Sequence, residues 1–158
     1  MADVRVGLGF DVHATQVGRP LRLGGVDIAD TPGLAGHSDA DVVCHAVADA
    51  VQGAAGLGDL GQHFPDTDPA LEGMGGLELL SRVMAMTAGA GLAASSCDLT
   101  VVAERPSIAG VREQIRSNLS EILGVAPERV SVKATRPEGL GLAGDGVGCI
   151  AVAVLVPR

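Results

Sequence analysis

Asp11 and His13 stand two residues apart in the motif DVH. Side chains at positions i and i+2 of an extended strand project to the same side, so this carboxylate and this imidazole could share one ligand. Asp41, His45 and Asp49 follow at intervals of four, which aligns them as a polar ridge beside an apolar helix face. Plainer interpretations are a capping aspartate beside a surface histidine, and a solvated helix ridge.

A metal ion is the ligand that these residue types favour together. One aspartate and two histidines, without a thiolate, would give zinc three protein ligands and leave its fourth position open, as in catalytic zinc sites. Calcium and magnesium are disfavoured here because imidazole is a poor ligand for hard cations. The pattern therefore predicts a catalytic zinc site if Asp11, His13 and His45 converge, with Asp49 as an outer partner of His45.

Two further segments carry polar groups. His37 and Ser38 come just before a helix expected from Ser38 to about Ala55, where free amide groups and the helix dipole suit a phosphate. The plainer interpretation is that Ser38 caps the helix and His37 is a loop residue. Residues 56–69, rich in glycine, proline and aspartate, predict a loop without regular structure. Its aspartates could accept hydrogen bonds from hydroxyl groups, although turn chemistry explains them equally well.

The spacing of apolar residues and turn residues predicts the elements that position these groups. We expect strands at 4–11, 21–23, 26–28, 97–103, 130–135 and 149–156, and helices at 38–55, 77–87 and 108–123. The strands at 21–23 and 26–28 should form a hairpin around a Gly24-Gly25 turn, and Gly124 should end the last helix. This order predicts one α/β domain over residues 1–158, an α+β sandwich with helices on one face of a mixed sheet. The strand at 149–156 is apolar throughout, so a second copy of the chain should cover the other face.

Composition excludes several classes of protein. The 158 residues fit one domain, and 47% hydrophobic against 19% charged residues allow a buried core. The net charge is −8, and residues 1–72 hold eleven acidic residues and only three arginines. We therefore expect a cation to bind in this first half. Six of the eleven basic residues lie at 105–136, a region suited to an anion. Without a dominant basic face, we expect no nucleic-acid partner.

Membrane and redox roles are also disfavoured. The longest apolar run, at 146–157, is too short for a spanning helix, which needs about 20 residues. The N-terminal sequence lacks the apolar stretch of a signal peptide, so we expect a cytoplasmic protein. Cys44, Cys97 and Cys149 form no CxxC pair and are expected to be buried free thiols.

Six motifs taken together resemble the 2-C-methyl-D-erythritol 2,4-cyclodiphosphate synthase family of the non-mevalonate isoprenoid pathway. They are GFDVH at 9–13, GHSDADV at 36–42, His45, GLGDLG at 56–61, FPDTD at 64–68 and VKATRPEGLGLAG at 132–144. The resemblance extends nearly end to end. It implies a homotrimer with inward-facing sheets and active sites at subunit interfaces.

The resemblance also implies a reaction. The 2-phosphate of 4-diphosphocytidyl-2-C-methyl-D-erythritol 2-phosphate attacks the β-phosphate of the same molecule, forming the cyclic diphosphate and expelling CMP. The nucleophile belongs to the substrate, so the protein requires no nucleophilic serine or cysteine. Positioning and charge neutralisation carry such a phosphoryl transfer.

By the same resemblance, zinc bound to Asp11, His13 and His45 polarises a β-phosphate oxygen, and Glu138 holds a magnesium or manganese ion. His37 and Ser38 match contacts to the phosphates. The methylerythritol pocket would comprise Asp59, Gly61, Phe64, Pro65, Asp66, Thr67 and Asp68. The adjacent subunit would supply a cytidine pocket of Ala103, Pro106, Ile108, Ala134 and Thr135.

Several positions depart from the family pattern. Arg136 replaces a threonine at a phosphate contact, where its guanidinium is expected to neutralise the diphosphate in catalysis. Ser107 replaces a basic residue, and Ala40 replaces a glycine, a change that helix propensity favours. Four replacements fall in a channel on the trimer axis and predict weak or absent binding of isoprenoid diphosphates there: Leu142, Ala143, Asp145 and Val147.

Two other functions are compatible with these residues. One is a zinc phosphoesterase that uses metal-bound hydroxide on an external phosphate ester. The other is a non-catalytic trimer that binds zinc or an isoprenoid, whose activity has decayed through the changes at Arg136 and Ser107. Retention of both sets of metal ligands argues against decay, because a pure binding protein does not require both.

Overall fold

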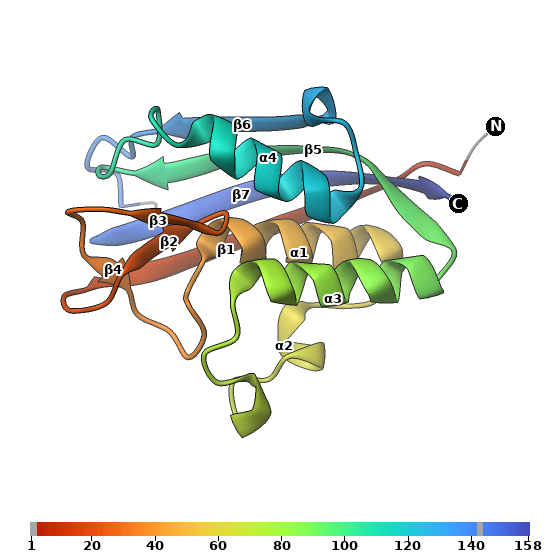
Figure 1. The fold of residues 1–158 in the computed structure, drawn as a ribbon, viewed down its shortest axis with the longest axis horizontal. Helices are drawn as coiled ribbons and strands as arrows, with labels where there is room; N and C mark the ends of the chain where they lie inside the picture. The colour runs from red at the N-terminus through yellow and green to blue at the C-terminus, as the bar shows by residue number, and fades with distance from the viewer. Residues whose placement is uncertain (1–2, 142–143) are drawn as a thin grey trace.

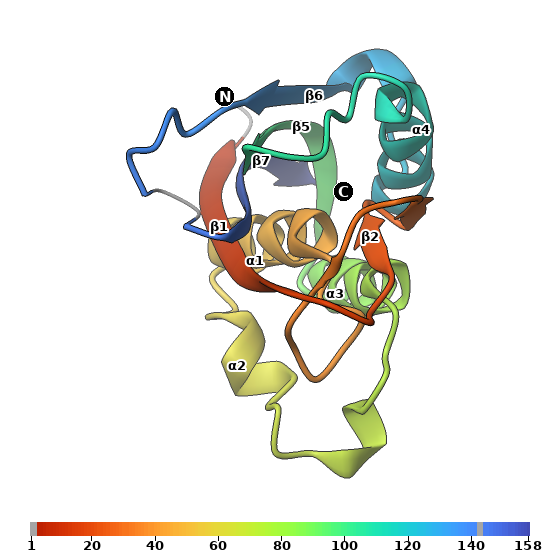
Figure 2. The same cartoon turned by 90° about the vertical axis from the view of Figure 1, so that its left-hand side faces the viewer.

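The computed structural model describes residues 3–141 and 144–158. A five-stranded mixed sheet, in the order β4-β1-β7-β5-β6, packs against three long helices on one face (Figures 1 and 2). The strands are β1 (Arg5–Gln16), β2 (Leu21–Leu23), β3 (Val26–Ile28), β4 (Gly33–Leu34), β5 (Leu92–Ala103), β6 (Val130–Thr135) and β7 (Gly146–Pro157). The helices are α1 (Val42–Ala55), α2 (Leu60–His63), α3 (Gly76–Gly89) and α4 (Arg112–Leu123), with 3-10 turns at Pro69–Leu71 and Pro127–Arg129. The mixed α/β architecture is confirmed.

The strand β1 is longer than the predicted segment 4–11. It pairs antiparallel with β7 as far as Ala14 and then with the short strand β4, where Thr15 lies opposite Leu34. These partners are distant in sequence, so no local pattern reveals where β1 ends. The extension places His13 inside the strand, two residues beyond Asp11 and on the same side.

The helix α1 lies unusually close to β1 because β1 has glycine at two facing positions. A Cβ atom at Gly9 would clash with the carbonyl oxygen of Ala46, and one at Gly7 would clash with that of Ala50. All but two of the residues of α1 are buried. The close contact between the two backbones brings the first turns of α1 over the middle of β1.

The start of α1 differs from the prediction. The helix begins at Val42, and its N-cap is Asp41 rather than Ser38. The Asp41 carboxylate accepts hydrogen bonds from the amides of Val43 and Cys44 and, across the fold, from Gly24 at 2.8 Å and Gly25 at 2.7 Å. Asp41 is therefore fully buried and is not part of a polar ridge with His45.

The two glycines that Asp41 binds form the turn of the predicted hairpin. Gly24 and Gly25 have φ values of 58° and 75°, a conformation that glycine adopts without strain. This hairpin, β2 and β3, is confirmed, and its turn lies against the beginning of α1. Tertiary contact with the turn, rather than local sequence, decides where the helix starts.

The residue before the N-cap corrects another expectation. Ala40 lies outside α1 and has φ 55°. The left-handed conformation costs an L-residue other than glycine about 1–2 kcal/mol. The replacement of the family's glycine by Ala40 is therefore not favoured by helix propensity, as the sequence suggested, because the position is not helical.

The segment 56–69 contains more structure than expected. It holds α2, whose N-cap Asp59 accepts from the amide of Gln62 at 3.0 Å, and Asp68 caps the following 3-10 turn. The prediction of a loop without regular structure was wrong, because capping aspartates allow short helices between the glycines and prolines. The helix predicted from Ile108 begins only at Arg112, after a turn.

The cysteine prediction is confirmed. Cys44, Cys97 and Cys149 are free and buried. Burial raises the pKa of the Cys97 thiol to about 12 and raises the pKa values of Cys44 and Cys149 well above the usual range. None of the three is a reactive nucleophile at neutral pH.

The outer face of the sheet is apolar where β1 and β7 meet. Leu8 is 67% exposed, Phe10 50% and Ile150 40%. Only one face of β7 is thus buried within one chain, whereas the apolar sequence of this strand predicts burial on both. An apolar patch of this kind is typical of an interface.

Gln52 on α1 is fully buried, and within the described residues its side-chain nitrogen and oxygen have no hydrogen-bond partner. A buried unsatisfied amide costs about 1–3 kcal/mol. We expect Gln52→Met, a change of similar volume, to raise the free energy of unfolding by about 1 kcal/mol in urea denaturation. Gln62→Met, at an exposed position, should change it by less than about 0.5 kcal/mol. A less stable Gln52→Met protein would contradict this prediction.

Candidate active site

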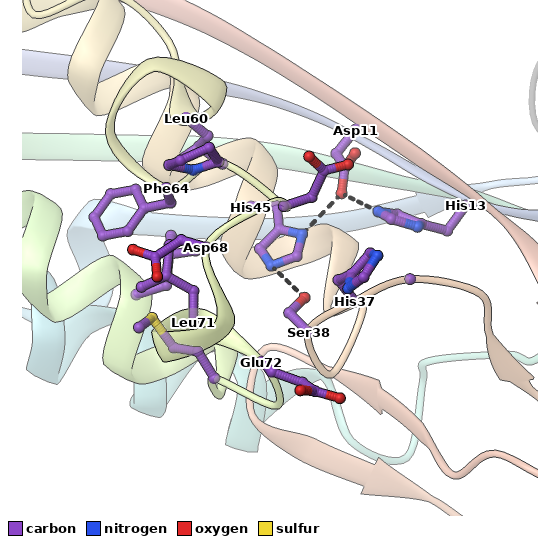
Figure 3. A pocket seen from close by; sticks show the side chains of 15 residues that line it. Asp11, His13, His37, Ser38, His45, Leu60, Phe64, Asp68, Leu71 and Glu72 are labelled. Atoms are coloured by element: carbon purple, nitrogen blue, oxygen red, sulfur yellow. Dashed lines mark hydrogen bonds and ion pairs between the residues drawn. The ribbon is translucent and has the colours of Figure 1, made fainter.

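Asp11, His13 and His45 converge as the sequence predicted (Figure 3). The Asp11 Oδ2 atom lies 3.1 Å from His13 Nε2 and 3.1 Å from His45 Nδ1. One ligand atom from each residue lies within 4.8 Å of the other two, and the described residues contain no other group of three such side chains. The strand β1 supplies Asp11 and His13, and the helix α1 supplies His45.

The two imidazoles present different nitrogens to this centre. His13 Nδ1 is hydrogen-bonded to the carbonyl oxygen of Ala35, so that nitrogen carries the proton and Nε2 is free to bind a metal. His45 Nε2 lies 3.3 Å from the hydroxyl oxygen of Ser38, which leaves Nδ1 facing Asp11. An outer partner on the second nitrogen of each ring is the arrangement of metal-binding histidines.

The electrostatics of the cluster suit a cation. Burial raises the pKa of Asp11, but its contacts with His13 and His45 outweigh that effect and hold the pKa well below its usual range. Contact with Asp11 raises the pKa of His13 against the opposing effect of burial. The carboxylate is thus ionised and attracts a cation. One oxygen and two nitrogen donors fit zinc or a similar transition metal.

Asp49 is not the outer partner of His45 that the helix spacing suggested. Its carboxylate accepts a hydrogen bond from the Leu60 amide at 3.3 Å, and burial raises its pKa. It therefore connects α1 to α2. The outer partner is instead Ser38, which the periodicity of the helix could not identify because it lies in the preceding loop.

A cavity of about 350 Å³ opens beside the three ligands (Figure 3). Among the residues singled out by sequence, its lining includes Asp11, His13, His37, Ser38, His45, Phe64, Pro65, Asp66 and Asp68. Sequence reasoning missed the apolar wall formed by Leu71, Met74 and Leu79, because their apolar character is equally typical of a core. The structure thus brings the phosphate-binding candidates and most of the 64–68 segment to the metal ligands.

Three residues assigned to the same pocket are not among those that line this cavity. Asp59 caps α2, and Gly61 lies within that helix. Thr67 lines a neighbouring hollow together with His37 and Asp66. For Asp59, the capping hydrogen bond agrees with the interpretation by turn chemistry, and its place in the methylerythritol pocket stays a prediction.

A second cavity, of about 250 Å³, lies where β5 and β6 end and α4 approaches. All five residues of the expected cytidine pocket line it: Ala103, Pro106, Ile108, Ala134 and Thr135. Arg136 and Ser107 line it too. The two cavities have no lining residue in common, so they are separate within one chain.

The remaining predicted positions lie beyond β6. Glu138 is exposed, with φ 52°, and lines neither cavity. Leu142 and Ala143 fall outside the described residues. Asp145 is exposed and lines an open hollow with Arg136, whereas Val147 is buried.

The fold and the site define a mixed α/β protein with a carboxylate and two imidazoles that could hold a divalent metal beside a cavity. The chain belongs to the YgbB family, whose profile matches residues 4–157. Among the described residues, no helix has the length and apolar character required to cross a bilayer.

Curated relatives cover nearly the whole chain. A 2-C-methyl-D-erythritol 2,4-cyclodiphosphate synthase from Symbiobacterium thermophilum is 51% identical over 97% of this chain and 99% of its own length. A bifunctional enzyme IspD/IspF from an Anaeromyxobacter species is 51% identical over 98% of this chain, which spans only 40% of that relative.

Solved structures of synthases with the same name are similar to this chain. A structure of 2C-methyl-D-erythritol-2,4-cyclodiphosphate synthase matches with a TM-score of 0.89 and 34% identity, covering 96% of this chain and 99% of that one. A form of that synthase described as bound to CDP has a TM-score of 0.88, at 34% identity and with the same coverage. The bifunctional IspDF of Campylobacter jejuni has a TM-score of 0.94 and 36% identity, covering all of this chain and 43% of that one.

Proposed function

We propose that this chain converts 4-diphosphocytidyl-2-C-methyl-D-erythritol 2-phosphate to 2-C-methyl-D-erythritol 2,4-cyclodiphosphate and CMP. It is an enzyme of isoprenoid biosynthesis, as are its relatives of 45–51% identity named for this product. The observation that carries the proposal is the convergence of Asp11, His13 and His45 beside a cavity lined by His37 and Ser38. The comparisons do not favour a phosphoesterase or a non-catalytic binding protein.

The chain's own residues bind and orient in this reaction. Asp11, His13 and His45 would hold zinc, which supplies a Lewis acid to a phosphate oxygen. His37 and Ser38, which line the same cavity, would bind the phosphates on either side of the reacting bond. Intramolecular attack by a substrate oxygen depends on this alignment rather than on a protein nucleophile. The burial of all three cysteines agrees with that requirement.

The other half of the site would come from a neighbouring subunit. The second cavity fits a cytidine, and relatives of this chain have been solved in complex with CDP. We propose a homotrimer in which the exposed apolar side chains of β1 and β7 are buried between subunits, bringing the two half-sites together. The exposed Glu138 would then hold magnesium or manganese on the diphosphate. A single catalytic domain and a cytoplasmic location remain predictions.

Arg136 lines the cytidine cavity, and we expect it to contact the diphosphate. Arg136→Ala should lower kcat by about tenfold or more, since loss of one donor to a developing charge typically costs more than this. Steady-state CMP release measures the effect. Arg129→Ala, at an exposed position in the 3-10 turn before β6, is the matched control and should keep its activity. An unchanged rate for Arg136→Ala would remove this residue from the site.

One incubation tests the proposed function. The purified chain is mixed with the diphosphocytidyl substrate and magnesium, with and without a zinc chelator, and CMP, cyclic diphosphate and inorganic phosphate are measured. We expect CMP and cyclic product in equal amounts, and their loss on chelation. Release of inorganic phosphate instead would indicate a phosphoesterase. No product from the zinc-loaded protein would indicate a binding protein.

A further inference from the structure

One loop contacts the outer nitrogens of both histidines at the metal centre. The Ala35 carbonyl oxygen accepts from His13 Nδ1, and Ser38 Oγ lies beside His45 Nε2. These contacts decide which nitrogen of each ring faces Asp11. The position of residues 35–38 therefore sets the geometry of two of the three metal ligands.

Arg19 holds this loop through two hydrogen bonds from its guanidinium. Its Nη1 donates to the carbonyl oxygen of Gly36, and its Nη2 donates to that of Ser38 at 2.6 Å. A guanidinium is a rigid planar fork, so it fixes two acceptors relative to each other in a way that a lysine ammonium does not. Both acceptors are backbone carbonyls within the segment 35–38.

Few backbone hydrogen bonds hold this segment to the rest of the fold. The Ala35 amide donates to the Ala14 carbonyl at 2.9 Å, and the His37 carbonyl accepts from Gly73 at 3.2 Å. The second of these partners belongs to another irregular segment. The two bonds from Arg19 are thus a large share of what orders the loop.

We propose that Arg19 is a positioning residue of the metal centre, which acts through residues 35–38 to orient the imidazoles of His13 and His45. The inference rests on the proposed function only in requiring that Asp11 and the two histidines bind a divalent metal. It assigns no contact between Arg19 and the substrate.

The charge of Arg19 predicts the opposite effect from its hydrogen bonds. The guanidinium is near enough to oppose positive charge on His13, although contact with Asp11 has the larger effect on that ring. By charge alone, removal of Arg19 would strengthen the binding of a divalent cation. If Arg19 acts by positioning residues 35–38, its removal weakens the binding of the cation. The direction of the change in metal affinity therefore distinguishes the effect of the charge of Arg19 from the effect of its hydrogen bonds.

The experiment measures zinc and cobalt affinity by competition with a chelator, starting from metal-free protein. We expect Arg19→Ala to bind about tenfold more weakly, the lower end of the effect of losing an outer partner of a metal ligand, because Arg19 orders the loop that carries those partners. Arg19→Lys keeps the charge but loses the fork, and should fall between Arg19→Ala and wild type. The control is Arg82→Ala, which removes an exposed arginine paired with Glu78 on α3 and should leave affinity unchanged.

Nitrogen-15 NMR of the zinc-loaded proteins adds a readout that a general loss of stability would not move. In the wild type, zinc should bind Nε2 of His13 and Nδ1 of His45, and in Arg19→Ala at least one ring should show a mixture of bound nitrogens. Unchanged or tighter metal binding by Arg19→Ala overturns the proposal. If that variant does not fold, wild-type affinity in a folded Arg19→Lys protein overturns it. These measurements need no turnover, so failure of the proposed reaction would be seen separately.

Discussion

Replacement of His45 with alanine is expected to abolish zinc binding at micromolar concentrations and to lower kcat/KM by about 10³-fold or more. The loss corresponds to about 4 kcal/mol of transition-state stabilisation, within what a Lewis-acid metal supplies. Without this imidazole, only Asp11 and His13 remain, both on β1, and the ligand from α1 is missing. Metal content by mass spectrometry and the rate of CMP release measure the two effects.

The matched control is His63→Ala. His63 lies exposed at the end of α2, where its ring bonds the Leu57 carbonyl at 2.6 Å, and it is not one of the three ligands. We expect this variant to retain its metal and its activity. Circular dichroism should show that metal-free His45→Ala is folded. Full metal content in a folded, active His45→Ala protein would exclude this cluster as the metal centre.

Asp41→Ala is expected to lower the free energy of unfolding by about 4 kcal/mol. The buried carboxylate accepts four backbone hydrogen bonds, two inside α1 and two from the hairpin turn, at 2.7–3.1 Å. Hydrogen bonds to a charged group contribute about 1.5–3 kcal/mol each, and each buried donor left unpaired adds a penalty of about 1–3 kcal/mol. The desolvation of the charge offsets part of that sum. Urea denaturation of the metal-free protein measures the change.

Two variants separate this effect from loss of an ordinary helix cap. Asp41→Asn keeps one acceptor oxygen, so its stability should lie between those of wild type and Asp41→Ala. Asp68→Ala removes the cap of an exposed 3-10 turn and should cost about 1 kcal/mol. If Asp41→Ala costs no more than Asp68→Ala, the bonds across the hairpin do not contribute to stability.

Local sequence patterns correctly predicted the elements that are determined by residues close together in the sequence. The glycine pair at 24–25 encodes a hairpin turn, and Gly124, with φ 68°, ends α4 as expected. These patterns failed where contact with a segment distant in sequence determines where a helix or strand begins or ends. Asp41 caps α1 because a hairpin turn packs against it, and β4 extends β1 because residues 33–34 return beside Thr15.

The same division applies to the site. The period of a strand predicted that Asp11 and His13 lie together, and both the helix spacing and the resemblance to a known family indicated His45 as their partner. Side-chain spacing could not reveal Ser38 and Ala35 as the outer partners, because one is identified by its position in a loop and the other contributes only a carbonyl oxygen. Arg19 was missed for the same reason, since its acceptors are backbone atoms.

Gly9 has no side chain, and this fixes how closely α1, which carries His45, approaches β1, which carries Asp11 and His13. The absent Cβ lets the carbonyl of Ala46, the residue after His45, approach the strand that carries Asp11. A larger residue at position 9 would force α1 outward and widen the triangle of donor atoms while leaving all three donors in the sequence. The spacing of the three donor atoms therefore depends on the distance between the backbones of α1 and β1. A comparison of the ligand residues alone would not detect a change in that distance.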